Sequence, residues 1–196
     1  MTNEINNKKP VFGWPSLYFL ILPVTFFLTI WWLREASGPY WLHFNLDPTY
    51  SYLFNSLNLL NDIPPNHIDH PGTPVQFLGM LIMKIAHPGS SVDEITNKIL
   101  RDPERYIELI NQVIIFLNSL VLFFIGVVAY KTFKNFISPT FLQLSPFLST
   151  LVLRHGTQFK PEIILVLATL MLILLSLYAV SYTHLRAHET LRSLLW

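Results

Sequence analysis

The sequence predicts an all-α membrane protein with about four transmembrane helices and a large outer segment of interfacial helices between the first two. Of the 196 residues, 52% are hydrophobic and 13% are charged, against about a quarter charged in a typical soluble domain. Four stretches approach the ~20 mostly apolar residues that a helix needs to cross a bilayer. The net charge of +1 gives no electrostatic case for a nucleic-acid partner, and the lack of cysteine excludes disulfides and thiolate metal sites.

The four predicted spans differ in how continuous they are. The first carries no charge and ends on Trp31 and Trp32, where an interfacial aromatic belt is expected. The third is the weakest because Pro139 and Pro146 interrupt it, although neighbouring helices can satisfy such breaks. The fourth begins at Pro161, a favoured first helical position. The predicted bounds are Trp14–Leu33, Gln112–Tyr130, Phe136–Leu153 and residues 161–179.

Basic residues in short loops set the predicted orientation, because such loops stay in the cytoplasm. The pairs that set it are Lys8 and Lys9, before the first span, and Lys131 and Lys134, between the second and third. Residues 1–13 are therefore predicted to be cytoplasmic, and residues 34–111 to lie outside. Arg154 and Lys160 run against this rule, because they fall in a short outer loop before the fourth span.

The end of the chain breaks the pattern of apolar spans. The stretch VSYTHLRAHET, from Val180 to Thr190, is abruptly polar after a clean apolar helix. The DNA of a common transposon-based sequencing adapter, read in its third frame, encodes the same eleven residues in the same order. We therefore expect residues 180–196 to be a non-native tail, and the natural protein to be longer and to have more spans.

The outer segment is too long for a plain connection, and it predicts helices that lie in the membrane interface. Asp47 followed by Pro48 is a helix-start pattern, after which apolar residues recur at helical spacing. A second apolar helix is predicted over Val75–Ala86, which is too short to span a bilayer. Asp102 and Pro103 then restart a helix that leads into the second span.

Three short motifs carry a family resemblance. They are LDPTYSYLFN after the first span, HPGTPVQFLGML before the second interfacial helix, and RHGTQFKPEIIL before the fourth span. Their order over residues 14–179 resembles the N-terminal part of the GT-C class of integral-membrane glycosyltransferases, such as the protein O-mannosyltransferases and the lipid A aminoarabinose transferases. The chain departs from that class in two places. Asp47 is followed by Pro48 where a Glu is usual, and His70-Pro71-Gly72 stands in place of Lys-Pro-Pro.

The resemblance implies transfer of a sugar from a polyprenyl-phosphate donor to an acceptor on the outer face of a bacterial inner membrane. It implies membrane lipids and the lipid-linked donor as partners, and no metal or other cofactor. Asp47 would be the catalytic carboxylate that takes or orients the acceptor proton. The 196-residue chain by itself is expected to be inactive, because this class has many more spans. The residues expected to bind the donor phosphate are His67, His70, Arg154, His155, Lys160 and Glu162.

Each of these roles has a simpler alternative. Asp47 can serve only as a helix cap, and Glu162 only as an acid that stabilises a helix N-terminus. His67, Asp69 and His70 can hold a metal ion, or form a turn between two helices. A non-catalytic membrane scaffold or lipid-binding subunit is the second function class, and a transporter is the third. The sequence does not define the sugar, the lipid carrier or the acceptor.

Overall fold

The structure, a computed structural model, describes residues 17–42, 49–66 and 72–194, and the side chains only as far as Tyr182, without that of Ser181. Every regular element among these residues is a helix, which confirms the predicted all-α class. The α-helices are α2 (Ile21–Ala36), α3 (Thr49–Leu60), α4 (Thr73–Ala86), α5 (Val92–Arg101), α6 (Pro103–Phe133), α7 (Ile137–Leu144), α8 (Thr150–Gly156) and α9 (Pro161–Leu194). Two short 3-10 helices join them, η1 (Tyr40–Leu42) and η2 (Ser145–Leu148).

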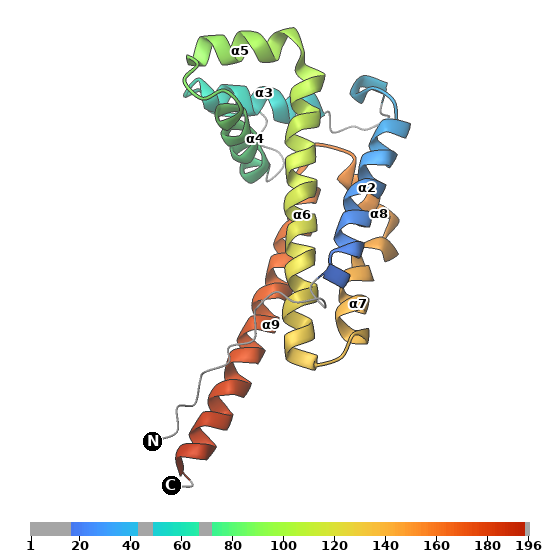
Figure 1. Cartoon of the computed structure of the whole chain (residues 1–196). Helices are drawn as coiled ribbons and strands as arrows, with labels where there is room; N and C mark the ends of the chain where they lie inside the picture. The colour runs from blue at the N-terminus through green and yellow to red at the C-terminus, as the bar shows by residue number, and fades with distance from the viewer. Residues whose placement is uncertain (1–16, 43–48, 67–71, 195–196) are drawn as a thin grey trace.

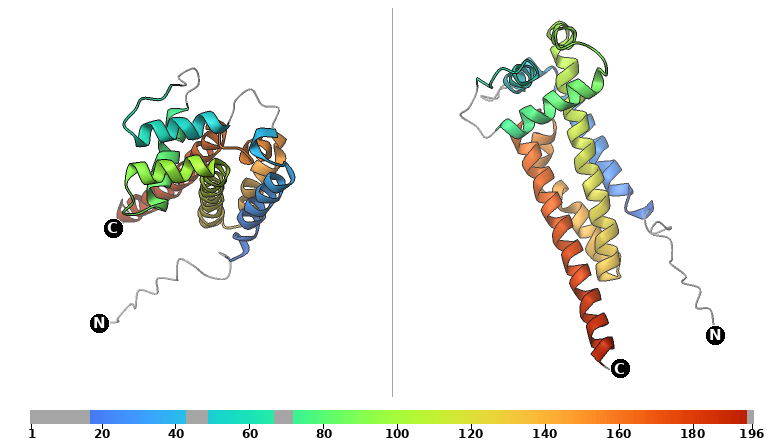
Figure 2. Two further views of the ribbon diagram at one scale, coloured as in Figure 1. Left: turned by 90° about the horizontal axis from the view of Figure 1, so that it is seen from above. Right: turned by 90° about the vertical axis from the view of Figure 1, so that its left-hand side faces the viewer.

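The helix α6 forms the central pillar of the molecule (Figure 1). Helices α2, α7 and α8 lie along one side of it, and α9 lies along another. Helices α3, α4 and α5 gather at the upper end of the pillar, where α4 lies across the start of α9 (Figure 2, right). Asp102 starts α6 as predicted, since its carboxylate accepts a hydrogen bond from the Arg105 backbone N–H at 3.4 Å.

Two of the four predicted spans are present as helices long and apolar enough to cross a membrane. They are α6 and the part of α9 from Pro161 to Val180. The first predicted span is not confirmed, because α2 begins only at Ile21 and is 16 residues long. The third is not confirmed either, because it divides into α7, η2 and α8. The division falls at Pro146, whose missing N–H interrupts helical hydrogen bonding. α9 continues to Leu194, through the stretch that matches the adapter translation.

Two apolar clusters hold the helices together. The upper one joins α3, α4 and α5 to the first half of α6, and it includes Tyr52, Met83 and Ile110. The lower one joins α2 to α6 and α9, and it includes Ile30 and Leu122. The predicted helices of the outer segment exist as α3 and α4, and each buries one face in the upper cluster.

A polar clamp fixes α7 in the lower part of the molecule. The Gln143 side-chain amide donates to the carbonyls of Phe19, at 2.8 Å, and Leu122, at 3.1 Å. It fits because Gly126 of α6 has no side chain: a Cβ there would lie 2.3 Å from Gln143 Nε2. One amide therefore links α7 to α6 and to the residues that precede α2.

Candidate functional site

The turn between α8 and α9, residues 157–160, is buried along its whole length. The Asn111 amide of α6 donates to the Gly156 carbonyl at 3.0 Å, which fixes the start of the turn. Gly156 lies so close to α2 that a Cβ would be 2.7 Å from Ile30 Cδ1. Thr157 closes the end of α8, because its hydroxyl donates to the Arg154 carbonyl at 2.8 Å. The turn is thus held between α2 and α6.

Phe159 connects this turn to the helices above it. Its ring packs edge-on against Tyr52 of α3, with the ring centroids 6.2 Å apart. Gly79 of α4 lets the helices approach, because a Cβ there would lie 2.9 Å from the Phe159 ring and 2.6 Å from the Ser56 hydroxyl. Three segments distant in sequence therefore meet around one aromatic ring.

Two ionisable residues follow Phe159 in this buried place. Lys160 is only 2% exposed, and it interacts with another residue, since a buried ammonium without a partner would be very costly to desolvate. Glu162 lies in the first turn of α9, where the helix dipole stabilises an acid. Its Oε2 atom is buried and has no hydrogen-bond partner among the described residues. Native proteins rarely leave such a group unsatisfied, so this oxygen is available to accept a hydrogen bond from a ligand.

Gln76 adds an amide to the same region. It is 1% exposed, and within the described part of the chain neither its Nε2 nor its Oε1 has a hydrogen-bond partner. It lies one turn before Gly79, on the face of α4 that meets Tyr52 and Phe159. The Oδ1 atom of Asn111 is likewise buried without a partner in that described part. We call Gln76, Asn111, Lys160 and Glu162 the polar junction.

The structure divides the predicted site residues into three groups. Lys160 and Glu162 belong to the polar junction. Arg154 is exposed on α8 and His155 is half-buried beside it, so neither lies as deep as Lys160. The remaining three, Asp47, His67 and His70, lie outside the described residues, as does Asp69 of the alternative metal site. No group of three or more His, Cys, Asp or Glu side chains in the described ranges is arranged to hold a metal ion.

Three described residues, Thr49, Asn66 and Gly72, flank residues 43–48 and 67–71 in the sequence. Thr49, directly after residues 43–48, is buried at the start of α3. The Asn66 backbone N–H, directly before residues 67–71, donates to Asn55 Oδ1 of α3 at 3.0 Å. On the other side of that gap, a Cβ on Gly72 would lie 3.1 Å from Gln76 Nε2. Asn66 and Gly72, which flank residues 67–71, therefore contact α3 and the side chain of Gln76.

A second polar group lies at the upper end of α2, around a hollow of about 330 Å³. The Arg34 guanidinium stacks on the Tyr40 ring, 3.7 Å from its centroid, and donates to the Gly38 carbonyl. Burial raises the pKa of Tyr40, and Arg34 opposes that shift. Burial and a 2.6 Å hydrogen bond to Glu104 raise the pKa of Tyr50 to about 12. The Tyr50–Glu104 hydrogen bond ties α3 to the first turn of α6, and the contacts of Arg34 tie the end of α2 to the segment that follows it.

Sequence reasoning missed Gln76 and Asn111. Gln76 is the one polar residue within VQFLGMLIM, the apolar run from Val75 to Met83, and that isolation was the available signal. Asn111 stands just before the predicted second span, in a stretch that reads as a solvated helix. Only the packing of α8 against α6 places its amide inside the protein.

No protein-family model, curated protein or solved structure matches this chain. The class of this protein is therefore described from its structure alone. It is an all-α protein with two candidate membrane-spanning helices and a buried polar junction where α4, α6 and α9 meet.

Proposed function

We propose that the chain belongs to an integral-membrane glycosyltransferase that takes a sugar from a polyprenyl-phosphate donor on the outer face of a bacterial inner membrane. The observation that carries the proposal is the polar junction. Ionisable and amide groups inside an apolar helical protein are expensive, and they usually mark a substrate or ion pathway. In this chain, polar atoms of Gln76, Asn111 and Glu162 are buried without a partner in the described ranges.

The donor groups of the junction, on Lys160 and Gln76, suit a phosphate bound to a lipid, whereas Asn111 Oδ1 and Glu162 Oε2 only accept hydrogen bonds and do not contribute to binding it. Lys160 supplies a positive charge directly before α9, and the positive end of that helix favours an anion. The Gln76 amide supplies two N–H donors that are not used within the described chain. Such preorganised donors stabilise the charge that develops on the departing lipid phosphate. Arg154 and His155 of α8 would guide the anionic head group toward the junction.

The acceptor side of the proposal rests on Asp47. A carboxylate within reach of the acceptor hydroxyl acts as a general base or orients it. Residues 43–48 lead directly into α3, whose Tyr52 packs on Phe159 beside Lys160. His67 and His70 belong to the segment between Asn66 and Gly72, which leads into α4 and Gln76. The proposal thus assigns the acceptor to the α3 side and the donor phosphate to the α9 side.

The proposed topology has four segments in the bilayer, the N-terminus in the cytoplasm, and α3, α4 and α5 outside. Large apolar side chains are exposed on α2 and on α7 to α8, as expected for surfaces that face lipid. Those on α2 are Ile21, Val24, Leu28, Trp31 and Trp32, and those on α7 to α8 are Ile137, Phe141, Leu148 and Leu151.

The first experiment measures binding of undecaprenyl phosphate to the full chain in lipid nanodiscs. Gln76→Leu is the most informative variant, because removing unpartnered polar atoms leaves the free fold as stable or more stable. We expect Gln76→Leu and Lys160→Gln each to weaken binding about ten- to hundredfold, since a charge-assisted hydrogen bond contributes about 1.5–3 kcal/mol. The control is Lys84→Gln, which removes an exposed cation of α4. Equal binding by Gln76→Leu, Lys160→Gln and the unmodified chain would contradict the proposal.

The second experiment tests Asp47 in the protein encoded by source DNA re-sequenced across codon 180. The proposal predicts that Asp47→Asn abolishes sugar transfer while the protein still inserts in the membrane at normal levels. Transfer that survives at the normal rate would exclude Asp47 as the base. It would favour the alternative of a scaffold or lipid-binding subunit.

A further inference from the structure

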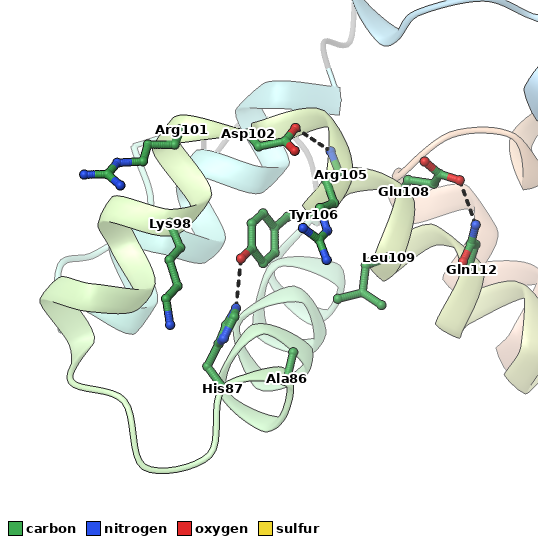
Figure 3. A pocket seen from close by; sticks show the side chains of 10 residues that line it. All are labelled: Ala86, His87, Lys98, Arg101, Asp102, Arg105, Tyr106, Glu108, Leu109 and Gln112. Atoms are coloured by element: carbon green, nitrogen blue, oxygen red, sulfur yellow. Dashed lines mark hydrogen bonds between the residues drawn. The ribbon is translucent and has the colours of Figure 1, made fainter.

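A separate hollow of about 530 Å³ lies between the last turns of α4 and α5 and the first turns of α6 (Figure 3). None of the residues of the polar junction lines it. Basic groups outnumber acidic ones around it, so a bound ligand would meet net positive charge. The ionisable residues that line it are His87, Lys98, Arg101, Asp102, Arg105 and Glu108.

The two acids of the hollow are already engaged. The Asp102 carboxylate caps α6, and Glu108 Oε1 accepts a hydrogen bond from Gln112 Nε2 at 2.8 Å. By contrast, no ion pair of Lys98 or Arg105 with a described residue is found, and Figure 3 shows the Lys98 side chain directed toward His87. Since basic residues outnumber the two acids around the hollow, its ligand should carry negative charge.

A hydroxyl group and an imidazole ring line the same hollow. The Tyr106 hydroxyl lies 2.9 Å from His87 Nε2, and this pair joins the end of α4 to the first turns of α6. Phosphate oxygens accept hydrogen bonds from hydroxyl, imidazole and guanidinium groups together. Ala86 and Leu109 complete the lining with apolar surface. The hollow therefore combines positive charge, hydrogen-bond donors and an apolar wall.

An apolar stripe on α4 leads to this hollow. Phe77, Leu81 and Ile85 recur every fourth residue, so they share one face of the helix, and all three are exposed. The opposite face, with Gln76, Gly79 and Met83, is packed in the protein. The stripe ends one residue before Ala86, which lines the hollow. Apolar surface beside a basic site is the arrangement expected for a bound lipid.

We propose that the hollow and the stripe together bind one anionic phospholipid. Its phosphate group lies among Lys98, Arg105 and the His87–Tyr106 pair, and an acyl chain runs along Phe77, Leu81 and Ile85. A soluble anion would gain nothing from the stripe, and a zwitterionic lipid would gain less from the net positive charge. This site goes beyond the proposed transfer reaction, because it shares no residue with the polar junction. It anchors the α4–α5 layer to the membrane surface.

The test is lipid retention by the full chain, measured by native mass spectrometry after phosphatidylglycerol or phosphatidylcholine is added to delipidated protein. We expect phosphatidylglycerol to be retained preferentially. The double variant Lys98→Gln/Arg105→Gln should weaken its binding about thirtyfold, because each basic residue near a lipid surface contributes about fivefold. The charge-matched control Lys84→Gln/Lys131→Gln, which changes two exposed cations outside the hollow, should bind as the unmodified chain does.

A third variant tests the stripe. Leu81→Asn should weaken phosphatidylglycerol binding while leaving the charge of the hollow unchanged. Three results would overturn the proposal: equal retention of both lipids, equal loss in the Lys84→Gln/Lys131→Gln control, or unchanged binding by Lys98→Gln/Arg105→Gln. Thermal unfolding of each variant in the same detergent verifies that the exposed substitutions leave the fold intact. Undecaprenyl phosphate binding is measured separately. A negative result for phosphatidylglycerol would therefore leave the proposal for the polar junction unaffected.

Discussion

The helices α6 and α9 are both long and apolar, yet they differ in what surrounds them. In the most apolar 18-residue stretch of each, 56% of α6 is buried inside the protein, against 11% of α9. α6 contacts α2, α3, α7 and α9, whereas much of α9 is exposed, including Leu165, Leu172 and Leu175. Hydropathy therefore predicts that a helix leaves water, but it does not predict whether protein or lipid replaces the water.

The largest expected contrast comes from removing one apolar side chain on each helix. Ile114 of α6 is fully buried, and Ile114→Ala should lower the free energy of unfolding by about 2–4 kcal/mol through the cavity it leaves. Leu172 of α9 is 65% exposed, and Leu172→Ala should change it by less than about 0.5 kcal/mol. Reversible unfolding in mixed micelles measures both. Equal losses would contradict the burial difference.

The next contrast enlarges a side chain on each helix. Gly126→Ala should destabilise the fold by about 1–3 kcal/mol, because the new Cβ would displace Gln143 from its clamp. On α9, Ala168→Val adds bulk at an exposed position and should stay within about 0.5 kcal/mol. A neutral Gly126→Ala would mean that α7 does not pack against α6 as described.

A smaller effect is expected from the clamp itself. Gln143→Met keeps the length of the side chain but removes both hydrogen bonds, to Phe19 and Leu122. We expect a loss of about 1 kcal/mol, the usual size for such bonds between helices. Thr169→Ala on α9 is the matched control, because that exposed hydroxyl bonds only to the carbonyl of Leu165 in its own helix. The same unfolding assay compares the two variants. Equal effects would show that the Gln143 hydrogen bonds do not stabilise the packing of α7.

The smallest effect concerns the first turn of α6 and depends on pH. The pKa of Tyr50 is raised to about 12, first by burial and then by Glu104 in the first turn of α6. Because the folded state holds the proton more tightly, this contribution to stability is full below about pH 10, the ordinary pKa of tyrosine. It is lost as the pH rises toward 12.

Glu104→Gln tests that assignment directly. It removes the negative charge beside Tyr50, so the pKa of Tyr50 should fall toward its ordinary value. Titration of tyrosinate absorbance, with Tyr50→Phe to identify the signal, measures the change. An unchanged titration in Glu104→Gln would show that burial alone raises this pKa.

The same comparison explains how much of the molecule the sequence could predict. Apolar runs and proline helix-start patterns locate α6, α9 and the helices α3 and α4 of the outer segment, because these are local signals. The sequence marked Pro139 and Pro146 as interruptions of the third span, but it did not show that α7 continues through Pro139 and that the division falls at Pro146, since membrane helices often tolerate proline. Lys160 was predicted as a loop residue, and the packing of the turn before α9 buries it.

The candidate sites were harder to predict because they form between distant segments. Lys160 and Glu162 were found from one motif, since they are close in sequence. Gln76 and Asn111 come near these two residues only through the packing of α4 and α8, which no local pattern predicts. The basic hollow is formed by α4, α5 and α6 together, so that His87 and Arg105, which are separated in the sequence, line the same space. The roles of Asp47, His67 and His70 stay predictions, because these residues lie outside the described ranges.

The most direct test of the account asks whether α6 crosses the membrane with the α3–α5 layer outside. The chain has no cysteine, so single reporters can be placed at Asn97 of α5 and at Lys131 near the other end of α6. Both positions are exposed. A membrane-impermeant maleimide is added to intact cells. The account predicts that Asn97→Cys is labelled at once and Lys131→Cys only after permeabilisation. Equal labelling of the two, or the reverse order, would contradict it.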